Sequence, residues 1–86
     1  MASAQRGLWK LMLKLPAMRG QLQMESAKNK ALVGLCDAFD DATTALDELN
    51  RDPRSNADLI KEYETICSEI ESEVIDLCIN LKSRSI

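Results

Sequence analysis

Residues 60–81 have the sequence IKEYETICSEIESEVIDLCINL, and this stretch decides the fold. Its apolar side chains recur at alternating spacings of three and four residues, which is the heptad pattern of a helix packed along one seam. The members of this seam are Ile60, Tyr63, Cys67, Ile70, Val74, Leu77 and Leu81. Ser55 and Asp58 form a capping-box pattern just before it. The sequence therefore predicts a helix over residues 56–82.

A second seam with the same spacing lies upstream of the first. Its members are Leu32, Leu35, Phe39, Ala42, Leu46 and Leu49. Between the two seams, Pro53 cannot continue the helical hydrogen bonds, so residues 50–55 are predicted to form a turn. Such a short connection makes the two helices antiparallel neighbours. Facing residues then have numbers that sum to roughly 107, which pairs Leu32 with Val74 and Phe39 with Cys67.

The first 24 residues are expected to form a separate basic amphipathic helix or arm. The apolar arc of this helix comprises Leu8, Trp9, Leu11, Met12, Leu13 and Leu15, and its basic side comprises Arg6, Lys10 and Lys14. Pro16 ends or kinks the helix, so the following helix begins either at Pro16 or nearer Ser26. The segment either extends past the open end of the hairpin or folds back on it, and we expect its apolar arc to lie beyond the reach of the last helix.

Together these patterns predict an all-α protein. Residues 25–86 are expected to form an acidic, coiled-coil-like antiparallel helical hairpin, and residues 1–24 an additional N-terminal amphipathic helix, as parts of a helical bundle. Folding would bury only about 63% of the surface of a chain this small, which is marginal for a lone domain. Outside the seam, Ile75 and Ile79 are either scattered surface residues or a second packing face for a third helix or another chain.

Charge is divided unevenly along the chain. Residues 1–30 carry six basic side chains and one acidic side chain, whereas residues 31–86 carry five basic and thirteen acidic ones. On the predicted second helix, the acidic residues expected on the outer side are Asp37, Asp40, Asp41, Asp47 and Glu48. Such a surface is either a solvated face or a docking surface for a basic partner.

The composition argues against catalysis and against bound cofactors or metals. The chain contains no histidine, which removes histidine-based nucleophiles and histidine-containing zinc sites. Its three glycines are too far apart for a phosphate-binding loop. The acidic window 37–48 has Phe39 at a ligand position of an EF-hand and lacks the required glycine. We therefore expect no enzyme activity, no cofactor and no metal site.

Cysteine usage indicates a reducing compartment. Cys36, Cys67 and Cys78 are odd in number and form no CxxC pair, so we expect small, buried, apolar thiols. Free thiols are typical of the cytoplasm or nucleus. The sequence has no apolar run long enough to span a bilayer.

The leading hypothesis for function is a non-enzymatic helical interaction or assembly module, a small subunit or adaptor of a larger helical complex. Its partners would be proteins, through self-association or a hetero-oligomer, and the N-terminal helix is expected to carry the recognition. The alternative is a membrane-surface or organelle-targeted protein, attached through the basic N-terminal helix with Trp9 at the interface. Nucleic-acid binding is disfavoured because the arm is mostly apolar and the acidic remainder would repel phosphate.

Overall fold

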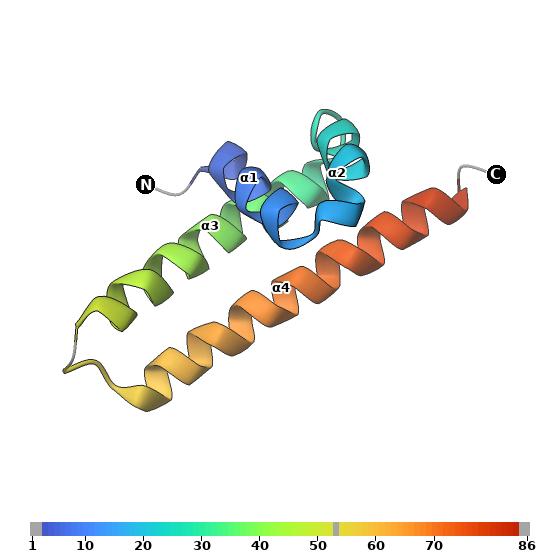
Figure 1. Ribbon diagram of the computed structural model, residues 1–86. Coiled ribbons are helices and arrows are strands. Elements are labelled where there is room, and N and C mark those ends of the chain that lie inside the picture. The colour runs from blue at the N-terminus through green and yellow to red at the C-terminus, as the bar shows by residue number, and fades with distance from the viewer. Residues whose placement is uncertain (1–2, 53, 85–86) are drawn as a thin grey trace.

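The computed structural model describes residues 3–52 and 54–84, with side chains up to residue 80. These residues form the helices α1 (Ala4–Lys14), α2 (Arg19–Ser26), α3 (Lys30–Arg51) and α4 (Ala57–Arg84), with a 3-10 turn, η1 (Pro16–Met18), between α1 and α2. The prediction of an all-α fold is confirmed, and the molecule is elongated, with extents of 51 × 21 × 20 Å (Figure 1).

Helices α3 and α4 form the predicted antiparallel hairpin, and α4 begins close to the predicted residue. In the turn, the backbone N–H of Ser55 donates to the carbonyl oxygen of Asp52 at 3.0 Å. The side-chain oxygen of Asn56 accepts a hydrogen bond from the backbone N–H of Asp58 at 2.8 Å. The cap of α4 is therefore Asn56, and the predicted capping box at Ser55 is wrong by one residue, because Ser55 belongs to the turn.

The sequence predicted one helix after Pro16, which would begin either at Pro16 or nearer Ser26. The structure has two helices in this segment, α2 and α3. Pro16 has no backbone N–H and begins η1, after which α2 runs to Ser26. A new helix, α3, then starts at Lys30, where the side chain of Asn29 accepts a hydrogen bond from the backbone N–H of Leu32 at 3.1 Å. The break between α2 and α3 lets the chain reverse direction and bring α1 back onto the hairpin.

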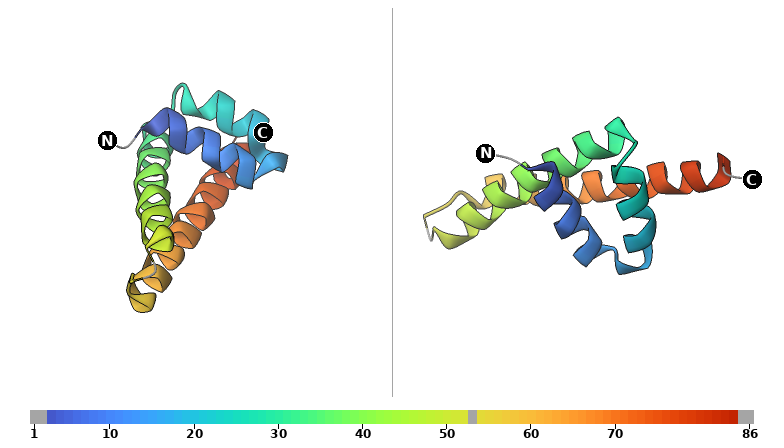
Figure 2. Two further views of the ribbon diagram at one scale, coloured as in Figure 1. Left: turned by 60° about the vertical axis from the view of Figure 1, so that its left-hand side comes forward. Right: turned by 90° about the horizontal axis from the view of Figure 1, so that it is seen from above.

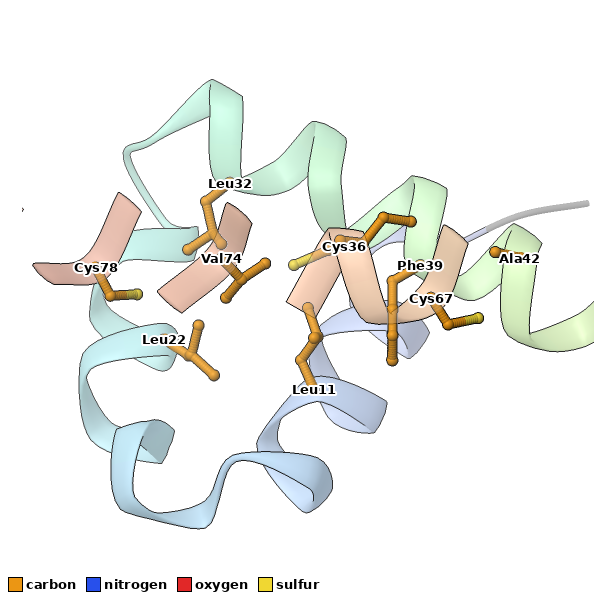
Figure 3. Close-up of a cluster of buried hydrophobic side chains, with 10 residues drawn as sticks. Leu11, Leu22, Leu32, Cys36, Phe39, Ala42, Cys67, Val74 and Cys78 are labelled. Carbon is orange, nitrogen blue, oxygen red and sulfur yellow. The ribbon is translucent and has the colours of Figure 1, made fainter. Parts of the chain in front are cut away.

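The core lies near the open end of the hairpin, where four helices meet. It consists of Leu11, Leu22, Leu32, Cys36, Phe39, Ala42, Cys67, Ile70, Val74 and Cys78 (Figure 3). Both predicted pairs of facing residues, Leu32 with Val74 and Phe39 with Cys67, belong to this cluster. Because Leu11 and Leu22 also enter it, the core draws on residues from both sides of the boundary that the sequence suggested near residue 24.

The expectation that the apolar arc of the first helix lies beyond the reach of the last helix is wrong for most of the arc, although Trp9 and Leu13 stay exposed. Leu11 is fully buried, and Leu8, Met12 and Leu15 are half-buried against the core. The physical reason is that α1 folds back and packs across α3, so its apolar side completes the core of the hairpin.

Helices α1 and α2 cover the hairpin near its open end and leave the turn end as two helices alone (Figures 1 and 2). The seam residues nearest the turn are consequently only half-buried; they are Leu46, Leu49, Ile60 and Tyr63. Of the other seam residues, Leu35 and Leu77 are half-buried, and the side chain of Leu81 lies outside the described residues.

Candidate functional site

A buried carboxylate on α3, Asp40, holds α1 in place. The guanidinium of Arg6 donates from Nε to Oδ1 at 2.9 Å and from Nη2 to Oδ2 at 3.1 Å. Nζ of Lys10 lies 2.9 Å from Oδ1, and the backbone N–H of Ser3 donates to Oδ2 at 2.8 Å. The hydrogen bond from Arg6, with those from Lys10 and Ser3, holds the pKa of Asp40 well below its usual range despite burial.

This pairing corrects the expectation that Asp40 lies on the outer side of its helix. Asp40 is fully buried, whereas Asp37, Asp41, Asp47 and Glu48 are exposed as expected. A buried carboxylate needs charged partners and hydrogen bonds to offset its lost hydration, and α1 supplies both. Asp40 is therefore part of the joint between two helices and is not available to a partner.

Two further features fix α1 on the hairpin. A Cβ atom built at Gly7 would fall on the carbonyl oxygen of Cys36, so glycine permits the close approach of α1 to α3. On the basic side of α1, Nζ of Lys14 lies 3.8 Å from a carboxylate oxygen of Glu71 on α4. All three basic residues of this side thus face acidic side chains of the hairpin.

The structure divides the predicted partner-binding residues of the first helix into two groups. Leu8, Leu11, Met12 and Leu15 pack in or against the core, and Arg6, Lys10 and Lys14 form the ion pairs just described. Trp9 and Leu13 remain outside, with 61% and 58% of their surface exposed. Since they are four residues apart, they adjoin on the side of α1 that faces away from Leu11. We call this pair the α1 patch.

A second apolar surface lies at the turn end of the hairpin. Leu46 of α3 and Ile60 and Tyr63 of α4 are half-buried there, and exposed Asp47 and Glu64 flank them. We call these three apolar residues the turn-end strip.

The predicted second face on α4 is partly exposed. Ile75 is half-buried, and Ile79 keeps 54% of its surface exposed. A hollow of about 300 Å³ lies between α1, α2 and α3; it is lined by Ala4, Gln5, Leu8, Ser26, Val33 and Cys36. The thiol of Cys36 is the one titratable group in this lining. Burial raises the pKa of this thiol to about 11, so it stays protonated at neutral pH.

The cysteines behave as small apolar core residues. Cys36, Cys67 and Cys78 are all free and buried, and burial raises the pKa of each thiol. Among the residues that the structure describes, no group of three or more His, Cys, Asp or Glu side chains could hold a metal ion. Within the same part of the chain, no helix is long and apolar enough to cross a membrane.

Sequence reasoning missed the contact between α1 and α3, in which Gly7 approaches Cys36 and Arg6 pairs with Asp40. A signal for it does exist, because Arg6 and Lys10 are four residues apart, as are Cys36 and Asp40, so each pair lies on one helix face.

Searches for related proteins add no constraint: no family model, no curated protein and no solved structure matches this chain.

Proposed function

We propose that this protein is a non-enzymatic helical assembly module, a small subunit or adaptor that packs against the helices of a protein partner. The observation that supports this proposal is the uneven covering of one continuous seam. At the open end, α1 and α2 help to bury Leu32 and Val74 of the seam completely, whereas at the turn end Leu46, Ile60 and Tyr63 are only half-buried. A helix from another subunit would complete the turn end as α1 completes the open end.

The total surface supports the same proposal. The chain exposes 6032 Å². A compact monomer of 9.6 kDa would expose roughly 5,100 Å². The excess of about 900 Å² is close to the roughly 800 Å² that each partner contributes to an interface of standard size. The elongated shape thus offers enough surface for one stable protein contact.

Attachment to a membrane surface through α1 is the second candidate, and the α1 patch favours it. Trp9 and Leu13 could enter the interfacial region of a bilayer as an apolar pair. Its electrostatic component is weakened, however, because Arg6 and Lys10 pair with Asp40, and Lys14 faces Glu71. For this reason we favour a protein partner.

The three free thiols support the expectation of a reducing compartment.

Sedimentation velocity, combined with circular dichroism and mass measurement of the intact complex purified from native cells, tests the proposal. We expect a species heavier than 9.6 kDa, or an incompletely folded monomer that gains helicity when its partner is added. A monomer that is compact, melts cooperatively and co-purifies with no other subunit would contradict the assembly role.

A further inference from the structure

The contact between α1 and the hairpin shows how this hairpin receives a basic amphipathic helix. The apolar side of α1 places Leu11 in the core. Its basic side places Lys10 beside Asp40 of α3 and Lys14 beside Glu71 of α4. The receiving surface therefore consists of apolar seam residues between one carboxylate on each helix of the hairpin.

The same arrangement of residues repeats one heptad closer to the turn. On α3, Asp47 lies seven residues after Asp40, and on α4, which runs in the opposite direction, Glu64 lies seven residues before Glu71. Both steps lead toward the turn. Seven residues are two helical turns, so each carboxylate keeps nearly the same helix face.

The apolar residues repeat with the carboxylates. Leu46 lies seven residues after Phe39, and Ile60 and Tyr63 lie seven residues before Cys67 and Ile70. Phe39, Cys67 and Ile70 are buried in the core. Their counterparts in the turn-end strip are only half-buried, although Leu46 and Tyr63 also pack against the edge of the core. The strip and its two carboxylates thus have the composition of the surface that α1 covers.

The separation of the two surfaces suits two helices side by side. Seven residues correspond to about 10.5 Å along a helix. Packed helices lie about 8–10 Å apart. A second helix crossing the hairpin alongside α1 would therefore meet Asp47 and Glu64 where α1 meets Asp40 and Glu71.

Charge identifies the kind of helix that fits. In the described part of residues 31–86, ion pairs engage the acidic residues Asp40, Asp52 and Glu71. Asp47 and Glu64 form none there and are exposed. A second copy of the chain is a poor occupant, because the protein is acidic, with a pI near 4.8, and its own basic helix is already engaged.

We propose that the turn-end strip binds a basic amphipathic helix of a different protein, which lies alongside α1 with its basic residues at Asp47 and Glu64. The inference rests on the proposed assembly function and adds the surface and the chemistry of the partner. Binding by this mode is expected to weaken as salt is raised, since both carboxylates are exposed to solvent.

A titration of the full chain tests this inference. The probe is a synthetic peptide of about five helical turns, with leucine on one face and lysine on the other; a matched peptide carries glutamate in place of lysine. We expect the lysine peptide, and not the glutamate peptide, to shift the NMR signals of Leu46, Ile60 and Tyr63. The signals of Leu11 should stay in place because α1 remains docked.

Matched variants locate the binding site. Asp47→Asn combined with Glu64→Gln should weaken peptide binding about fivefold, the order expected for the loss of two exposed ion pairs. Glu62→Gln combined with Glu69→Gln removes the same charge from two other exposed positions of α4, seven residues apart, and should leave the affinity unchanged. Circular dichroism should show all variants equally folded, since the four side chains are exposed.

Three results would overturn the inference. The first is equal weakening by both double variants, which would indicate non-specific attraction. The second is a shift of Leu11 in place of the strip, which would mean that the peptide displaces α1. The third is the absence of peptide binding while sedimentation still shows an assembly; the proposed function would then stand without this surface.

Discussion

The two ends of the hairpin have the same heptad pattern and very different burial. At the open end, Leu32 and Val74 are completely buried, because α1 and α2 add a second layer over the seam (Figures 1 and 3). At the turn end, Leu46 and Ile60 occupy equivalent seam positions and are only half-buried. Heptad spacing therefore determines which residues face the neighbouring helix, whereas burial depends on the segments that fold back over the pair.

The two ends also differ in the burial of equivalent carboxylates. Asp40 is buried and satisfied by Arg6, Lys10 and the backbone of Ser3. Asp47, one heptad away, is exposed. Solvent hydrates the exposed carboxylate, whereas the buried one is stable only because cationic partners are built around it. This difference distinguishes a carboxylate that holds two helices together from one that stays accessible to solvent.

The largest expected difference between the two ends concerns a charge introduced into the seam. Phe39→Asp places a carboxylate in the core without a partner and should cost several kcal/mol, enough to unfold so small a domain. Leu46→Asp makes the same change one heptad away, where water can reach the carboxylate, and should lower the melting temperature far less. Thermal melts followed by circular dichroism measure both, with Glu69→Gln as a neutral control. Equal melting of the two Asp variants would disprove the difference in covering.

A methyl group added at Gly7 should have the next largest effect. The new Cβ would fall on the carbonyl oxygen of Cys36, so Gly7→Ala forces α1 away from α3 and should cost about 3 kcal/mol. Gly34→Ala is the matched control, because no atom lies within 4 Å of a Cβ added there. Since Gly34 lies inside a helix, this change should stabilise the fold by about 0.5–1 kcal/mol. Urea unfolding gives both values, and hydrogen exchange should show α1 opening only in the first variant. A stable Gly7→Ala protein with protected α1 amides would contradict this packing.

Sequence periodicity was sufficient to predict the antiparallel hairpin. The heptad seams identified α3 and α4, and Pro53 located the turn, because these are local patterns with a regular period. The return of α1 onto α3 could not be derived in this way. It depends on contacts between residues more than 30 positions apart, such as Arg6 with Asp40, which leave no period in the sequence.

The misplacement of Asp40 has a specific physical cause. The sequence has one apolar seam on this helix and therefore predicted that only the side of α3 toward α4 is buried. In the structure α3 has a second buried side, where Cys36 and Asp40 contact α1. For the same reason, only some of the predicted recognition residues of the first helix are exposed. The packing of α1 on α3 buries Leu11 and leaves Trp9 and Leu13 exposed.

Removal of the buried charge should have an intermediate effect. Asp40→Asn keeps the shape of the side chain but loses the ion pairs with Arg6 and Lys10, and should cost about 2 kcal/mol at neutral pH. Because the pKa of Asp40 is lower in the folded protein than its ordinary value of 3.8, the stabilisation is complete above that value and is lost as the pH falls below it. The stability difference between the parent and the variant should therefore shrink in strong acid. Urea unfolding at a series of pH values measures it, and a constant difference at all pH values would contradict the ion-paired state.

The smallest effect on stability is expected at the α1 patch. Trp9→Ala and Leu13→Ala remove side chains that are mostly exposed, so each should change the free energy of unfolding by less than about 0.5 kcal/mol. Leu11→Ala on the buried side of the same helix should cost about 2–5 kcal/mol. Urea unfolding of the three variants tests whether α1 has one buried and one free side.

The emission of Trp9 then distinguishes the two candidate roles of the α1 patch, because it is the only tryptophan in the chain. In the free protein its emission should be that of a hydrated indole, since 61% of its surface is exposed. A blue shift with anionic vesicles that weakens as salt is raised would favour the membrane role. A blue shift with the co-purified subunit and none with vesicles would make the patch part of the protein interface. If neither titration moves the emission while the subunit still binds, the contact lies away from α1, and the uncovered turn end becomes the surface to examine.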